Sequence, residues 1–135
     1  MVSSFAVGEP AYLLDSNILI YLLDGTSHEA RSRVEQCRPG EVVTSAITFA
    51  EVMRKAPPDD ARKRADVASV FRIVTVLPFD VDAAEAYRQV PFERHRFDHL
   101  IAAHALARRL VLVTRNDRHF REVPGLAVEN WTLPL

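Results

Sequence analysis

Four acidic side chains have the types and positions needed to hold divalent metal ions. Each follows a predicted strand or lies in a predicted apolar helix, and the four are Asp15, Glu51, Asp98 and Asp117. Carboxylate oxygens are the ligands that Mg²⁺ and Mn²⁺ prefer, and such ions offset the mutual repulsion of neighbouring acids. One ion lowers the pKa of a water molecule to give hydroxide, and a second, roughly 3.5 to 4 Å away, stabilises the leaving oxygen. The acids therefore predict metal-dependent hydrolysis of a phosphodiester bond.

Each acid taken singly also has a plainer interpretation. Asp15 stands between two apolar runs, where an unpaired charge costs several kcal/mol, but it could simply cap the following helix. Asp98 is expected in the first turn of a helix, where the helix dipole stabilises an acid by about 0.3 to 1 kcal/mol. Metal binding is the one explanation that the four acids share, and both interpretations stay open at this point.

Histidines offer a second kind of metal site. His95 and His99 are four residues apart and could bind zinc from one face of a helix. Against this, Arg96 and Phe97 are expected to lie in a loop. His104 lies inside an apolar helical segment, which predicts a core histidine with satisfied hydrogen bonds or a dimer-face residue. The chain has only four glycines, and none has the spacing of a phosphate-binding loop.

Composition predicts a single globular domain with an uneven charge. The chain has 135 residues, of which 48% are hydrophobic and 26% charged. The longest apolar run, 18–23, is far shorter than the ~18 residues of a membrane span, which predicts a protein without a membrane segment. Cys37 is the only cysteine, which agrees with a reducing compartment and predicts a cytoplasmic protein. Residues 1–10 are expected to form a disordered or extended lead-in, and residues 11–135 a single domain.

The basic residues gather in one part of the chain. The formal net charge is −1, yet the segment 88–121 holds eight arginines against three acids. A planar guanidinium suits bidentate contact with phosphate, which predicts a polyanionic partner near this segment. A solvated surface of ion pairs is the alternative.

Strand-like and helix-like segments alternate, and their order positions the acids. Strands are expected over 11–14, 41–44, 73–79, 111–114 and 126–130, and helices over 17–23, 28–37, 46–56, 60–72, 82–89 and 98–109. Strands joined by helices form a parallel sheet covered on both faces. The predicted fold class is α/β, a three-layer α/β/α sandwich with a central, mainly parallel sheet. Asp15 then falls at the carboxyl end of a strand, where open parallel sheets bind ligands.

Five stretches of the chain carry a resemblance to a known family. They are LLDSNILIYLL at 13–23, VTSAITFAEVM at 43–53, FDHLIAAHAL at 97–106, LVTRNDRHF at 112–120 and PGLAVENW at 124–131. In this order and spacing they resemble a PIN domain, specifically the VapC-type toxin ribonucleases. The resemblance implies a Mg²⁺- or Mn²⁺-dependent endoribonuclease on a PIN-like α/β/α fold. It also implies an RNA substrate, a homodimer and a cognate VapB-type antitoxin that holds the toxin inactive.

The resemblance assigns roles to individual residues. Asp15, Glu51 and Asp98 match the first three acids of the family pattern. Many members have Asp where this chain has Asn116, and Asp117 comes one residue later. We expect Asp117 to complete the metal site, because a carboxylate near clustered acids needs a metal more than it needs water, and Asn116 is the alternative. The supporting residues are expected to be Asn17, Thr114 and Asn116, and the RNA-contacting residues Arg94, Arg96, Arg115 and Arg118.

A function of a different class remains open. The same acids could bind one Mg²⁺ in a non-catalytic PIN-like or receiver-like module that acts through partner binding. A receiver would have two adjacent acids after its first strand and a lysine near its last. Neither LLDSN nor LVTRND supplies them. An assay of RNA cleavage with Mn²⁺, with and without EDTA, distinguishes an enzyme from a binding module.

Overall fold

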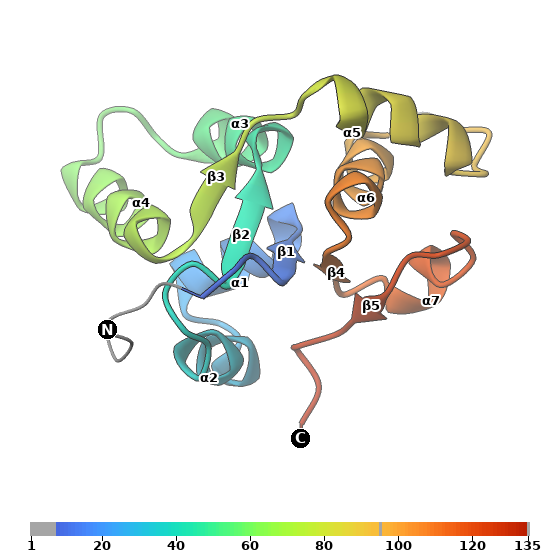
Figure 1. Ribbon diagram of the computed structural model, residues 1–135. Coiled ribbons are helices and arrows are strands. Elements are labelled where there is room, and N and C mark those ends of the chain that lie inside the picture. Colours follow the sequence, from blue (N-terminus) through green and yellow to red (C-terminus); the bar gives the residue numbers. More distant parts are fainter. Residues whose placement is uncertain (1–7, 95, 135) are drawn as a thin grey trace, which may run out of the picture.

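Five parallel strands form the centre of the molecule, and helices join them along the chain (Figure 1). The computed structural model describes residues 8–94 and 96–134. The strands are β1 (Tyr12–Leu14), β2 (Val42–Ser45), β3 (Thr75–Leu77), β4 (Val111–Val113) and β5 (Val128–Glu129). The helices are α1 (Ser16–Asp24), α2 (His28–Glu35), α3 (Ala46–Lys55), α4 (Ala61–Ile73), α5 (Val81–Ala86), the 3₁₀ helix η2 (Tyr87–Gln89), α6 (Phe97–Arg108) and α7 (Asp117–Phe120).

The strand order is β3-β2-β1-β4-β5, so the chain winds outward in both directions from β1. Tyr12 of β1 lies opposite Val42 of β2 and Val111 of β4. The carboxyl ends of these three strands therefore meet at one edge of the sheet. In open α/β sheets, ligands bind at this edge where the winding reverses, which here is between β1 and β4.

The two faces of the sheet bury separate apolar clusters, as strands covered on both sides require. Successive residues of β1 point to opposite faces. Leu14 packs with residues of α1 and α2, and Leu13 packs with residues of α6. Both leucines are fully buried. The predicted three-layer α/β/α fold with a parallel sheet is confirmed.

Side-chain caps decide where the helices begin. Asp15 caps α1 by accepting the Ile18 backbone N–H at 3.0 Å, and Ser45 caps α3 by accepting the Ile47 N–H at 3.1 Å. Gly25 follows α1 with a φ of 68°, a left-handed conformation that favours glycine. These local contacts put α1 and α3 directly after β1 and β2, so both helices start at the carboxyl edge of the sheet.

The structure differs from the predicted elements in several places. The expected strand 73–79 is shortened to β3 because Ile73 is still the last residue of α4, and the expected strand 126–130 is only β5. The expected helix 82–89 ends in the 3₁₀ turn η2. Helix α7 was not predicted at all, because four residues are too few to show a helical period.

Gly8, which belongs to the predicted lead-in 1–10, is hydrogen-bonded to the segment before β2. Residues 1–7 of the predicted lead-in lie outside the described residues. Gly8 donates its backbone N–H to the Pro39 carbonyl at 2.7 Å, and Ala11 donates to the Glu41 carbonyl at 2.9 Å. Within the described ranges, none of the helices is both long and apolar enough to cross a membrane.

His104 of α6 is buried in the core without a polar partner. It has no solvent exposure, and neither ring nitrogen has a hydrogen-bond partner among the described residues. Burial, aided by Arg108 and opposed by Asp80, lowers the pKa of His104 from its ordinary value of 6.5. Below pH 6.5 the folded chain therefore binds fewer protons than the unfolded chain. Stability from this residue is complete above that pH and is lost as the pH falls toward the lowered pKa.

Replacing His104 with Leu is expected to reduce the loss of stability in acid. Leu has a similar volume and no ring nitrogens to desolvate, and it can pack against Phe79, whose ring centroid lies 5.5 Å from that of His104. Urea unfolding at about pH 8 and about pH 5 should show the variant gaining stability relative to the wild type as the pH falls. The same stability difference at both pH values would contradict this prediction.

Candidate metal centre

Asp15 stands at the carboxyl end of β1, at the point where the winding reverses. The residue is only 5% exposed. Its Oδ1 accepts the Ile18 N–H at 3.0 Å, and the Thr114 hydroxyl, at the end of β4, also donates to the carboxylate. Burial raises the pKa of Asp15 to about 6 despite these hydrogen bonds, and the charges of Asp98 and Glu51 raise it further. Asp15 therefore caps α1 and also carries a charge that burial destabilises.

Glu51 and Asp98 lie within electrostatic range of Asp15. Glu51 projects from α3, and Asp98 from the first turn of α6. Burial raises the pKa of Glu51, and Asp98 raises it further, while Lys55 and the Ser16 hydroxyl oppose the shift. The structure thus brings three of the four predicted acids together, and we call Asp15, Glu51 and Asp98 the acid cluster.

Two oxygens of the acid cluster lack a hydrogen-bond partner. Glu51 Oε1 and Asp98 Oδ1 are buried, and neither has a hydrogen-bond partner among the described residues. Arg96 Nε lies 3.4 Å from Asp98 Oδ1, an ion-pair distance without the geometry of a hydrogen bond. A buried charged oxygen without a partner is costly, so these oxygens are suited to a bound cation.

Thr114, one of the predicted supporting residues, connects β4 to the acid cluster. It is fully buried. Its hydroxyl donates to Asp15 and accepts the Asn116 backbone N–H at 3.0 Å. The backbone N–H of Asn116 is thus linked to Asp15 through the Thr114 hydroxyl, and Asn116 itself is exposed. Asn17, the third predicted supporting residue, is also exposed, in the first turn of α1.

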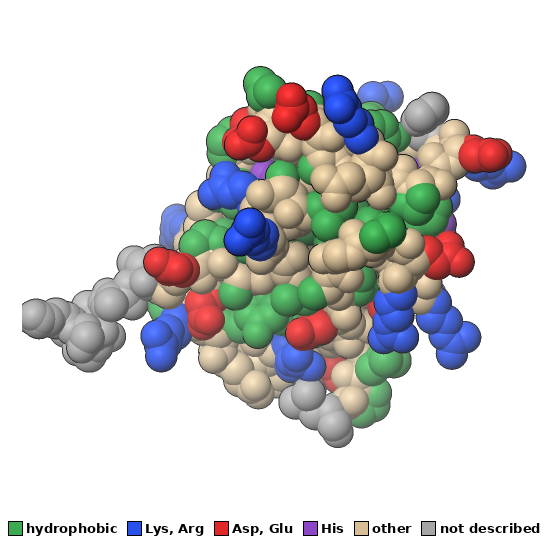
Figure 2. All heavy atoms as spheres, turned by 45° about the vertical axis from the view of Figure 1, so that its right-hand side comes forward, with side chains coloured by type: hydrophobic (Ala, Val, Ile, Leu, Met, Phe, Trp, Pro, Cys, Tyr) green, Lys and Arg blue, Asp and Glu red, His purple; other side chains and the backbone are tan. Residues whose placement is uncertain are grey.

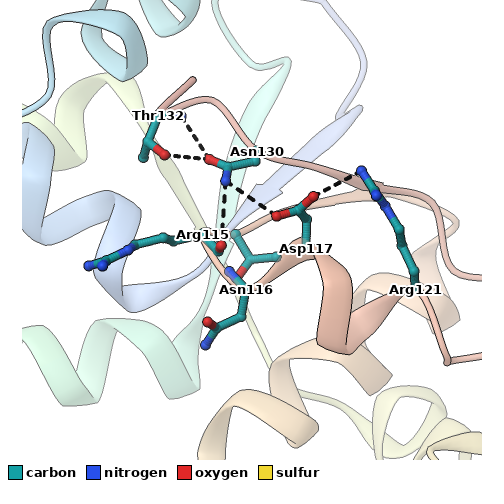
Figure 3. Close-up of polar contacts among 7 residues, drawn as sticks. Arg115, Asn116, Asp117, Arg121, Asn130 and Thr132 are labelled. Carbon is teal, nitrogen blue, oxygen red and sulfur yellow. Dashed lines mark hydrogen bonds and ion pairs between the residues drawn. The ribbon is translucent and has the colours of Figure 1, made fainter. Parts of the chain in front are cut away.

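The structure does not bring Asp117 to the acid cluster. Its carboxylate is turned toward Asn130 and Arg121 (Figure 3). Oδ1 accepts the Asn130 side-chain amide at 3.3 Å, and Oδ2 pairs with Arg121 Nη2 at 2.9 Å. Arg121 follows Asp117 by one helical turn, so the side chains of Asp117 and Arg121 lie on the same side of the helix. The carboxylate expected to complete the metal site is therefore engaged elsewhere.

Two histidines form a contact that the sequence analysis missed. His99 Nε2 lies 3.2 Å from His119 Nε2, and the His119 ring stacks on Phe92 with ring centroids 4.1 Å apart. His99 Nδ1 lies 2.7 Å from the Arg94 carbonyl oxygen. His95, the other half of the predicted zinc pair, lies outside the described residues. The two histidines lie 20 residues apart in the chain, so no local pattern in the sequence could have shown this contact.

Charge and unpaired oxygens, rather than a preformed coordination shell, make the acid cluster fit a divalent cation. Within residues 8–94 and 96–134, no three His, Cys, Asp or Glu side chains are placed closely enough to ligate one ion as they stand. The acid cluster nevertheless supplies three carboxylates, two with a raised pKa and two with a buried oxygen that accepts no hydrogen bond from a described residue. Hard oxygen donors of this kind suit Mg²⁺ or Mn²⁺ better than a softer metal.

The four arginines expected to contact RNA are all exposed. They are Arg94, Arg96, Arg115 and Arg118. Arg115 donates to the Tyr21 hydroxyl at 2.6 Å. Basic and acidic side chains are interspersed on the face shown in Figure 2, with apolar side chains between them. On this face the described residues therefore form no continuous basic surface.

Comparison with known proteins places the chain in a family. The PIN domain family model matches residues 12–126. The tRNA(fMet)-specific endonuclease VapC of Shigella flexneri is 31% identical over 130 residues, which cover 90% of this chain and 98% of the relative. Ribonuclease VapC2 of Haemophilus influenzae is 32% identical and covers 89% of this chain and 97% of the relative. The solved structure of DNA-bound VapBC from Salmonella typhimurium superposes with a TM-score of 0.79 at 30% identity, covering 90% of this chain and 98% of that chain.

The matched region contains all three residues of the acid cluster and the whole of the sheet up to β4. PIN nucleases of the VapC type depend on a metal in general, which agrees with one buried and two half-buried carboxylates at the carboxyl edge of the sheet. The family model, the two relatives and the solved structure each match most of the length of this chain. This chain belongs to the PIN-domain family, among the VapC ribonucleases.

Proposed function

We propose that this chain is a Mg²⁺- or Mn²⁺-dependent endoribonuclease and the toxin of a VapBC-type toxin-antitoxin pair. The observation that carries the proposal is the acid cluster at the carboxyl edge of the sheet, with two buried oxygens that accept no hydrogen bond from a described residue. An RNA substrate and a single cysteine, Cys37, both agree with action in the cytoplasm.

Asp15, Glu51 and Asp98 would hold the cation. When bound, a divalent ion lowers the pKa of a water molecule and stabilises charge that develops on the phosphate. The chain itself fixes the orientation of Asp15, because the Ile18 N–H and the Thr114 hydroxyl both bind its carboxylate. Oriented in this way before the substrate arrives, the carboxylate does not have to reorganise during the reaction.

RNA is the proposed substrate. Relatives from Shigella flexneri and Salmonella typhimurium are named tRNA(fMet)-specific endonucleases, which makes tRNA the first substrate to test. The proposed protein partners are a VapB-type antitoxin, in line with the solved VapBC from Salmonella typhimurium, and a second copy of this chain. The proposed contacts to RNA phosphates are Arg94, Arg96, Arg115 and Arg118.

Incubating the purified chain with tRNA and Mn²⁺, with and without EDTA, tests the proposal. We expect cleavage with Mn²⁺, no cleavage with EDTA, and recovery when Mn²⁺ is added in excess of EDTA, because the acid cluster needs a cation to act. Cleavage that EDTA leaves unchanged would reject the metal-dependent mechanism. Mn²⁺ binding without cleavage of any RNA would favour the non-catalytic metal-binding module.

A further inference from the structure

Asn130, the residue after β5, bridges the end of the chain and the turn that follows β4 (Figure 3). Its Nδ2 donates to the Arg115 carbonyl at 3.4 Å and to Asp117 Oδ1 at 3.3 Å. Its Oδ1 accepts the Thr132 N–H at 2.9 Å and the Thr132 hydroxyl at 2.5 Å. Both donor hydrogens and both acceptor sites of the amide are thus used, which fixes the orientation of the side chain.

Asn130 is attached to a rigid part of the fold. The preceding residue, Glu129, accepts Arg33 Nη2 at 3.1 Å and Trp131 Nε1 at 2.9 Å through one carboxylate oxygen. Trp131 is buried, and its ring meets the Tyr12 ring with centroids 4.9 Å apart. The backbone on both sides of Asn130 is therefore anchored, so its amide can hold the neighbouring turn in place.

Asp117 has both carboxylate oxygens engaged on the same side of the turn as Asn130. Arg121 holds Oδ2 at 2.9 Å, and Asn130 holds Oδ1. To reach the acid cluster, Asp117 would have to give up an ion pair and a charge-assisted hydrogen bond. The contacts therefore keep Asp117 away from the acid cluster.

The opposite side of the turn is held by Thr114. Its backbone N–H donates to the Glu129 carbonyl at 3.0 Å, and its hydroxyl joins Asp15 to the Asn116 N–H. Figure 3 shows the Asn116 side chain pointing away from Asn130 and Asp117. With the turn held on both sides, Asn116 is the side chain left free to serve the acid cluster.

We infer that Asn130 is a positioning residue of the proposed metal centre, where it holds the turn after β4 so that Asn116, and not Asp117, completes the acid cluster. The inference rests on the proposed function and deepens it. Asn116 would contribute an amide oxygen, a neutral ligand that Mg²⁺ and Mn²⁺ accept. Residues that orient a ligand typically change metal affinity by about 10- to 100-fold when they are replaced.

Mn²⁺ binding to the full chain, measured by isothermal titration calorimetry, tests the inference without an activity assay. Asn130→Ala should raise the Kd for Mn²⁺ by about tenfold or more. The matched control is Thr132→Val, which removes one donor to Asn130 Oδ1 but leaves the Thr132 N–H and both Nδ2 hydrogen bonds in place. We expect its Kd to stay within about twofold of the wild type, since the turn keeps its contacts.

A double-mutant cycle separates positioning from general loosening of the fold. If Asn130 acts through Asn116, then Asn130→Ala should change the Kd by less than about twofold in an Asn116→Ala background. An undiminished loss of affinity in that background would overturn the inference, as would a wild-type Kd for Asn130→Ala. Circular dichroism spectra of the variants check that each is folded.

Asp117→Asn keeps the inference testable should Asn130→Ala fail to fold. The amide of this variant can still accept from Asn130, so we expect the Kd for Mn²⁺ to remain within about threefold of the wild type. A rise of tenfold or more would make Asp117 a ligand and overturn the inference.

If the wild type binds no Mn²⁺ at all, the proposed metal centre fails together with the inference. If the wild type binds Mn²⁺ and only the Asn130 and Asp117 results differ from expectation, the inference alone fails.

Discussion

Asp98→Asn is expected to abolish ribonuclease activity while leaving the chain folded. The variant keeps the shape of the side chain and removes one of the three charges that would hold the cation. A bound ion supplies several kcal/mol of stabilisation to the transition state, so kcat/KM for RNA in Mn²⁺ should fall by about 100-fold or more. The fold should tolerate the change, because no described residue hydrogen-bonds Asp98 Oδ1, and the charge repels Asp15 and Glu51.

Asp82→Asn is the matched control for this experiment. Asp82 is also an acid in the first turn of a helix, α5, but it is exposed and outside the acid cluster. Its replacement should leave cleavage unchanged. Gel-based cleavage of tRNA and far-ultraviolet circular dichroism of both variants provide the measurements. Wild-type activity in Asp98→Asn would remove Asp98 from the proposed metal site.

Asp15→Asn is expected to stabilise the metal-free chain at neutral and alkaline pH. Burial raises the pKa of Asp15 from 3.8 to about 6, so the folded chain binds more protons than the unfolded chain between these values. The free energy of unfolding therefore falls as the pH rises through this window, and it stays lower above pH 6. Asn carries no charge, so the variant should gain about 1 to 3 kcal/mol at about pH 8 and little at about pH 4.

Asn at position 15 should preserve the start of α1, because Asn caps a helix about as well as Asp. The matched control is Asp60→Asn, which changes another aspartate cap, that of α4, at an exposed position. Its unfolding free energy should change little at either pH. Urea unfolding in EDTA gives the stabilities, and adding Mn²⁺ should then stabilise the wild type more than Asp15→Asn. A variant as stable as the wild type at about pH 8 would show that burial does not destabilise the Asp15 charge.

The order of strands and helices could be predicted from the sequence because its causes are local. Apolar runs of strand length, a cap such as Ser45 and a terminator such as Gly25 act over a few residues. The position of Asp15 directly after a strand followed from the same signals. The predicted edges of elements were less accurate, since neighbouring elements such as α4 and β3 compete for the same residues.

The convergence of the acid cluster depended on strand order, which acts over long distances in the chain. Because β4 pairs with β1, Thr114 comes beside Asp15 although about 100 residues separate them. A pattern of strands and helices indicates that a parallel sheet forms and that its carboxyl edge binds ligands. Which strands lie next to each other is decided by packing of both faces of the sheet.

The roles of Asn116 and Asp117 show most clearly what the tertiary structure decides. The sequence determined that an amide and a carboxylate follow Thr114 in a short turn, and either side chain could face the acid cluster. The structure turns Asp117 toward Asn130, which lies 13 residues further along the chain, and toward Arg121. A turn has too few backbone hydrogen bonds of its own to select a direction, so contacts with distant residues select it.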